Sequence, residues 1–205
     1  MLWRTLIFLG LISLVPVGAQ AQPQPAHFGA KLNAFTQPSN AGRGIFCNVS
    51  PARPDCSWVL MQAYQCEFGH CVNGHLAPKD GIIANVSLIA CFSGSFVLQI
   101  ANVMPNAIAT KNQAAVITSG PLITYNGDRR HYRGNRFDIE TFPVNVEVKQ
   151  GDYLAVATQK LGFVRCSGGG NNILLFNLPL PDGGPLRPAS GSDGCFMLLE
   201  AEYAQ

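Results

Sequence analysis

Residues 81–100 read GIIANVSLIACFSGSFVLQI, and this stretch predicts the fold class. Its apolar side chains recur at every second position, the spacing that places them on one face of a β-strand. The two predicted faces hold Ile82, Ala84, Val86, Leu88, Ala90 and Phe92, and then Phe96, Leu98 and Ile100. The Ser93-Gly94-Ser95 break between the two runs predicts a hairpin turn.

The chain beyond this stretch has the same pattern of short strands. Apolar runs bounded by turn residues predict strands over 116–125, 137–142, 144–148, 153–158, 163–166, 172–178 and 195–203. Helical periodicity is scarce, and we expect only one short helical turn, over 59–65. Because no internal repeat or linker divides these strands, the sequence predicts an all-β protein, an antiparallel β-sandwich that is jelly-roll-like.

The N-terminus predicts export. A head with one positive charge, residues 1–4, precedes an apolar run over 5–18, and the small-x-small site Ala19-Gln20-Ala21 follows. This order is that of a secretory signal peptide, and the apolar run is too short for a good transmembrane helix. We therefore expect a signal peptide over 1–21, a secreted or periplasmic location, and no membrane span after cleavage.

The mature chain is expected to form one domain. Residues 22–40 are polar and contain proline, which predicts a flexible N-terminal lead. A single β-sandwich domain over 41–205 would follow, since this length suits one domain. Its first part, residues 41–80, carries four cysteines in irregular sequence and predicts a disulfide-rich irregular segment.

The chain has seven cysteines, and export favours disulfides because compartments outside the cytosol are oxidising. Sequence alone cannot fix the pairing. Joining near neighbours, with a third bridge between distant parts of the fold, predicts the pairs Cys47–Cys56, Cys66–Cys71 and Cys91–Cys166. Cys195 would then remain as a free or intermolecular thiol, because the count is odd.

The segment CEFGHCVNGH, residues 66–75, could form either a small disulfide loop or a zinc site. It could supply Cys66, His70, Cys71 and His75 as ligands. Adjacent ligands at His70 and Cys71 are awkward because neighbouring side chains of an extended chain point to opposite sides. The paired spacing with a long intervening loop is also absent. We therefore predict a disulfide loop here and no metal, with zinc as the alternative.

The C-terminal third, over 142–203, contains FPVNVEVKQGDYLAV, a cysteine and glycine stretch, NNILLFNLPLPDGGP and SDGCFMLLEAEY. With these features it resembles uncharacterised secreted bacterial β-sandwich proteins. These motifs are strand and turn patterns. The resemblance therefore implies a secreted sandwich and carries no activity.

Composition excludes several classes of protein. Charged residues make up 13% of the chain, and its formal net charge of +2 falls to +1 when Arg4 leaves with the signal peptide. A nucleic-acid-binding protein would have a broad basic excess. An intrinsically disordered chain would have few apolar residues, whereas they are 47% here. The composition indicates a folded protein that does not bind nucleic acid.

One basic segment is the first choice for a ligand site. Its residues are Arg129, Arg130, His131, Tyr132, Arg133 and Arg136. Arginine offers paired donors to carboxylates and phosphates, so an acidic polysaccharide or a phosphorylated lipid headgroup would fit. The alternative is a solvated loop between strands, since runs of charge are usually solvated.

No residue is assigned a catalytic role, and no cofactor is expected. The carboxylate pairs Asp138 with Glu140 and Glu200 with Glu202 each share a strand face. Glycosidases place two carboxylates across a cleft, but nothing in the sequence marks a cleft. The glycine-rich stretch over 167–172 lacks the lysine and the following helix of a phosphate-binding loop.

Three functions follow from these observations. The first is a secreted, non-catalytic binding module for an anionic surface glycan or an envelope partner. The second is a structural protein of the envelope or extracellular matrix that assembles through sheet edges or the odd cysteine. The third is a glycoside-active enzyme. Fold alone does not choose among them.

Overall fold

The computed structural model describes residues 27–35, 55–62, 74–104, 112–127, 138–166 and 172–204. The protein is all-β, and its paired strands are antiparallel. A 3₁₀ helix, η1 (Leu32–Phe35), interrupts the strands near the N-terminus. Across these described ranges, no helix has the length and apolar character needed to cross a membrane.

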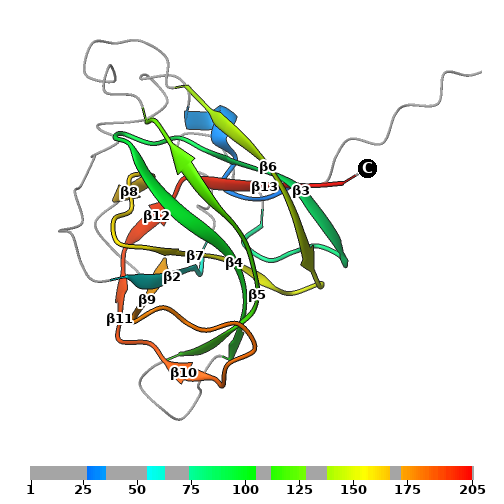
Figure 1. Ribbon diagram of the computed structural model, residues 1–205, viewed down its shortest axis with the longest axis vertical. Coiled ribbons are helices and arrows are strands. Elements are labelled where there is room, and N and C mark those ends of the chain that lie inside the picture. The colour runs from blue at the N-terminus through cyan, green and yellow to red at the C-terminus, as the bar shows by residue number, and fades with distance from the viewer. Residues whose placement is uncertain are drawn as a thin grey trace, which may run out of the picture.

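The strands form two main sheets and one small one (Figure 1). The four-stranded sheet has the order β1 (His27–Gly29), β13 (Leu199–Tyr203), β3 (Gly81–Leu88) and β6 (Glu140–Val148). The seven-stranded sheet has the order β10 (Arg187–Pro188), β5 (Gln113–Tyr125), β4 (Gly94–Met104), β7 (Tyr153–Thr158), β2 (Cys56–Leu60), β9 (Ile173–Asn177) and β11 (Gly191–Asp193). The small sheet pairs β8 (Val164–Cys166) with β12 (Cys195–Met197).

The two main sheets share one apolar core. The predicted face of Phe96, Leu98 and Ile100 on β4 is confirmed, and all three side chains are buried. They lie in the same cluster as Val86 and Leu88 of β3, which belongs to the other sheet. Burying both inner faces together removes apolar surface from water and holds the sheets against each other.

The predicted face of β3 is correct only in its second half. Val86 and Leu88 are in the core, but Ile82 is 43% exposed and Ile83 is fully buried. Asn85 and Ile83 pair with the consecutive residues Glu202 and Tyr203 of β13, so β3 has one extra residue, Ala84, at this point, as in a β-bulge. A bulge adds one residue and so moves the following side chains to the opposite face.

The predicted hairpin at Ser93-Gly94-Ser95 is wrong. β3 pairs with β13 and β6, whereas β4 pairs with β5 and β7, so the connection passes from one sheet to the other. Two alternating runs separated by a short turn fit either arrangement, because periodicity gives the buried face and not the partner strand. In Figure 1, β4 and β5 are the long, curved neighbours in the middle of the molecule.

Residues 56–60 are a strand and not part of an irregular segment or a helical turn. β2 lies between β7 and β9, and all five of its side chains are buried. Trp58 and Leu60 face the shared core, whereas Val59 joins a second cluster on the opposite face of the sheet. A strand buried on both faces shows no alternation, which is why the run CSWVL was missed.

The predicted N-terminal lead contains an edge strand. β1 pairs with β13, with Phe28 opposite Ala201, and Phe28 is buried. Gly29 has φ +96°, and a Cβ there would collide with the carbonyl oxygen of Leu199. The predicted signal peptide, residues 1–21, lies outside the described residues.

Two of the cysteine predictions are corrected. Cys56 is a buried thiol on β2, so the predicted Cys47–Cys56 bridge is wrong. Cys195 is disulfide-bonded, so it is not the left-over thiol. The β8–β12 pairing sets Cys195 directly opposite Cys166, a neighbour in the sheet that distance along the chain did not indicate.

The remaining cysteine predictions involve residues beyond the described part of the chain. Cys91 is disulfide-bonded. The side chain of Cys166 is outside the described set, so the Cys91–Cys166 pair stays a prediction. Cys47, Cys66 and Cys71 also lie outside the described residues, together with most of CEFGHCVNGH.

A buried polar network fixes the segment that crosses the outer face of the seven-stranded sheet. The Ser57 hydroxyl donates to Gln99 Oε1 at 2.7 Å and accepts the Leu180 N–H at 2.8 Å. Gln99 Nε2 donates to the Leu180 carbonyl at 3.1 Å and to Ser119 Oγ at 3.3 Å. These bonds satisfy polar groups that would otherwise be costly to bury.

Gln99→Ala should destabilise the fold strongly, because it removes three bonds at a site that is only 4% exposed. We expect the free energy of unfolding to fall by about 2–4 kcal/mol, as measured by urea denaturation. Asn102→Ala, at an exposed position of the same strand, is the control and should change it by less than about 0.5 kcal/mol. Equal effects of the two changes would contradict this account of the network.

Candidate functional site

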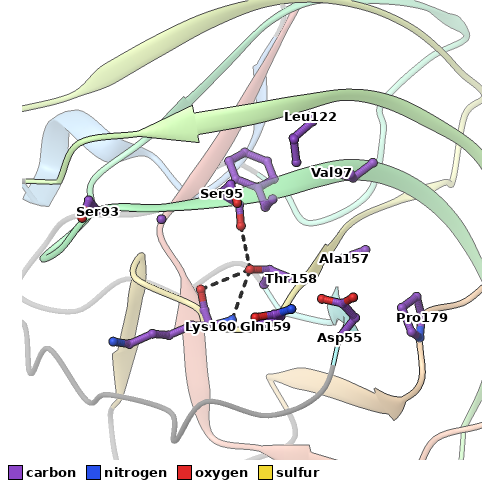
Figure 2. A pocket seen from close by; sticks show the side chains of 12 residues that line it. Asp55, Ser93, Ser95, Val97, Leu122, Ala157, Thr158, Gln159, Lys160 and Pro179 are labelled. Carbon is purple, nitrogen blue, oxygen red and sulfur yellow. Dashed lines mark hydrogen bonds between the residues drawn. The ribbon is translucent and has the colours of Figure 1, made fainter.

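An open hollow of about 550 Å³ lies at one end of the seven-stranded sheet (Figure 2). Its size is in the range of small-ligand sites. It is lined by Asp55, Ser93, Gly94, Ser95, Phe96, Val97, Leu122, Ala157, Thr158, Gln159, Lys160 and Pro179. Segments that are far apart in the sequence therefore meet here.

The register of three strands builds the floor of the hollow. Val97 of β4 is paired with Leu122 of β5 on one side and with Ala157 of β7 on the other. Val97 alternates with the core residues Phe96 and Leu98, so this row lies on the outer face. Leu122 is 68% exposed, a large apolar side chain left in solvent.

Thr158 holds together the polar side of the hollow. Its hydroxyl donates to the Ser95 carbonyl at 2.8 Å and lies 3.2 Å from the Lys160 carbonyl. The Lys160 N–H donates to the same hydroxyl at 3.2 Å. Figure 2 draws these three contacts around Thr158. Because Thr158 is buried, these contacts fix the start of β4 against the end of β7.

Polar groups reach solvent around this point. Asp55 and Gln159 are exposed, and Asp55 is the one acidic residue among those that line the hollow. Lys160 places its ammonium 4.3 Å from the centre of the Phe92 ring, and Figure 2 shows its side chain extending away from Asp55. The hollow thus offers a carboxylate acceptor and an amide beside an apolar floor.

Tyr125 supports the loop that carries Lys160. Its hydroxyl donates to the Lys160 carbonyl at 3.4 Å and accepts the Gly162 N–H at 3.2 Å. Its ring packs edge-on against Phe163, with ring centres 5.6 Å apart. Burial raises the pKa of Tyr125 to about 12, the Gly162 N–H acts against this rise, and the Glu140 carboxylate adds to it.

The basic residues predicted as a ligand site lie outside the described residues. These are Arg129, Arg130, His131, Tyr132, Arg133 and Arg136. Their flanks are described: the N–H groups of Asn126 and Gly127 donate to the Glu140 carboxylate at 2.9 and 2.7 Å. A Cβ at Gly127 would touch the backbone of Phe92, whose ring lies under Lys160. The described residue Gly127, which precedes this segment in the sequence, therefore lies near Phe92 and Lys160 at the end of the fold that holds the hollow.

The carboxylate pair on β13 lies elsewhere, on the outer face of the four-stranded sheet. Glu202 accepts the Asn85 amide at 3.1 Å, and His27 Nδ1 lies 3.8 Å from Glu200. Burial raises the pKa of Glu200, and the nearby His27 acts against this rise. Neither carboxylate lines the hollow.

A second hollow of about 430 Å³ lies between β3, β5 and β6 near the start of β3. Two of its carboxylates already hold the turn before β7: Asp152 accepts the Lys149 N–H at 2.8 Å, and Asp80 accepts the Gln150 N–H at 2.7 Å. In the described part of the chain, no three His, Cys, Asp or Glu side chains are grouped so as to hold a metal ion.

The sequence did not predict the residues of the first hollow as a site. Asp55, Leu122 and Thr158 belong to no motif, and only the strand register brings them together. Comparison of the chain with protein-family models, with curated proteins and with solved structures gave no match. The site must therefore be understood from its own chemistry.

Tyr125→Phe should destabilise the fold by about 1–3 kcal/mol in thermal denaturation at pH 7, because the buried Gly162 N–H loses its acceptor. An unfolded phenol ionises near pH 10, whereas the folded Tyr125 does so at about 12. The wild-type protein should therefore lose stability as pH rises between these values, and this part of the loss should be absent in the variant. Parallel stability curves of the two proteins above pH 10 would show that this assignment is wrong.

Proposed function

We propose that the protein is an exported, non-catalytic binding module, and that the hollow beside β4, β5 and β7 binds a surface glycan. The observation that carries this proposal is the pairing of exposed polar groups at Asp55 and Gln159 with the exposed apolar side chain of Leu122 in one hollow. A sugar has the matching surface, since it combines hydroxyl groups with apolar C–H patches.

Within this proposal the two main sheets are the layers of a jelly-roll β-sandwich. Four nested pairings support it: β4 with β5, β3 with β6, β2 with β7, and β1 with β13. Rolling up one long hairpin of eight strands gives this nesting, with β1, β13, β3 and β6 in one sheet and β2, β7, β4 and β5 in the other. Jelly rolls include lectin domains, which is an analogy of fold.

Two observations support export. The first is the signal-peptide pattern over 1–21. The second is that Cys91 and Cys195 are disulfide-bonded, a state that persists in oxidising compartments. The alternative function, a structural protein that assembles through an unpaired Cys195, loses its support because Cys195 is disulfide-bonded.

A non-catalytic role agrees with the acid groups of the hollow. Hydrolysis of a glycoside usually requires two carboxyl groups on either side of the bond. Among the described residues that line the hollow, Asp55 supplies the only carboxylate. A single acceptor can bind hydroxyl groups without the general acid and second carboxylate that cleavage requires.

Asp55→Asn should weaken glycan binding at least tenfold, because a hydrogen bond to a charged acceptor contributes about 1.5–3 kcal/mol. The measurement is a saturation-transfer NMR titration with D-glucose, D-galactose, D-fucose, D-quinovose, N-acetyl-D-glucosamine and D-glucuronate. Glu147→Gln, which removes an exposed carboxylate on β6, is the matched control and should bind as the wild type does. Wild-type protein that binds none of these sugars would remove the proposal.

The basic segment predicts a preference for anionic glycans, and polygalacturonate tests this preference separately. Replacing Arg129, Arg130 and Arg133 by Ala should weaken its binding, because guanidinium groups pair with carboxylates. The loss should shrink as salt rises, since salt screens exposed charges. Neutral sugars should bind the variant and the wild type equally. Unchanged binding of polygalacturonate would restrict the ligand to neutral glycans.

A further inference from the structure

Leu178 has a backbone conformation that leucine rarely adopts. Its φ is +88°, and the other described residues with positive φ are glycines. Such a conformation is strained for a residue with a branched side chain. Gly183, five residues later, also has a positive φ, +64°. The same segment therefore has a glycine at its other position of positive φ.

The strain is not offset by burial of the leucine. Leu178 is 64% exposed, so its side chain contributes little to the core. Replacing it with glycine would relieve the backbone and remove an apolar group from water contact. Folding alone therefore gives no reason for a leucine at this position.

Arg187 holds the strained backbone from both sides. Its Nη1 donates to the Pro179 carbonyl at 3.2 Å, and its Nη2 donates to the Asn177 carbonyl at 3.5 Å. The Asn177 N–H is also held, since it donates to Ser190 Oγ at 3.0 Å. These bonds fix the residues on either side of Leu178 and so fix its conformation.

This position adjoins the hollow. Pro179, the next residue, lines it. On the other side, Asn177 is paired with Cys56, which directly follows the lining residue Asp55. Leu178 thus directly precedes a lining residue on the β9 side of the hollow, which we call its rim. Leu122 belongs to β5, and β4, β7 and β2 lie between β5 and β9.

We infer that Leu178 is a specificity-determining residue, held at the rim by Arg187 to contact an apolar group of the bound glycan. This inference rests on the proposed function and narrows its ligand to sugars that carry a methyl or acetyl group. A 6-deoxy sugar or an N-acetyl sugar would place its hydroxyls toward Asp55 and its methyl group against leucine. Burial of this methyl group would make the methyl-bearing sugar bind more tightly than the fully hydroxylated sugar.

The experiment compares three matched pairs of sugars on four proteins. The pairs are D-fucose with D-galactose, D-quinovose with D-glucose, and N-acetyl-D-glucosamine with D-glucose. The proteins are the wild type, Leu178→Gly and Leu178→Ala, with Leu186→Ala as the control for an exposed leucine in the same segment. Binding is followed by saturation-transfer NMR and stability by thermal denaturation.

The wild type and Leu186→Ala should prefer the methyl-bearing member of at least one pair several-fold. Both Leu178 variants should lose that preference. Leu178→Gly should also melt about 2–4 °C higher than the wild type because its strain is relieved, whereas Leu178→Ala should not.

The failures can be told apart. If the wild type binds none of the sugars, the proposed function fails, and this inference fails with it. If the wild type binds but the Leu178 variants keep the same preferences, only this inference is overturned. A Leu178→Gly protein that melts no higher than Leu178→Ala would overturn the strain argument.

Discussion

The antiparallel pairing of the two halves of the chain is the constraint on which the rest of the structure depends. β4 pairs with β5 at the innermost turn, and each earlier strand pairs with a later one, out to β1 with β13. Successive pairs lie in alternate sheets, and the inner faces of both sheets meet in one core. Every strand that contributes to the hollow is positioned by this pattern.

The hollow depends on register in a direct way. Val97 lies between Leu122 and Ala157 only because three strands are aligned at that point, and a shift of one residue would turn this row into the core. The Ser57–Gln99–Leu180 network then fixes the crossing segment that carries Leu178 and Pro179. Strand pairing and these hydrogen bonds therefore join the core, the outer network and the rim of the hollow.

Sequence predicted the elements whose signals are local. The strand over 153–158 was predicted with its correct bounds, because a Gly-Asp turn precedes an apolar run. The strand of Cys56–Leu60 was missed because burial on both faces removes alternation. The face of Ile82 was wrong because β3 has an extra residue opposite β13, and this reverses the face. The hollow could not be predicted, since Asp55 and Leu122 meet only through strand pairing. The positive φ of Leu178 has no sequence signal at all.

The position of the ligand can be found by mapping backbone amide shifts in the isotope-labelled protein as N-acetyl-D-glucosamine and D-fucose are added. We predict that the shifts cluster around the hollow, at Ser95, Val97, Leu122, Gln159 and Leu178. Shifts centred on Asn85, Ser87 and Glu202 would place the ligand on the outer face of the four-stranded sheet. That result would contradict the assignment of the hollow as the binding site.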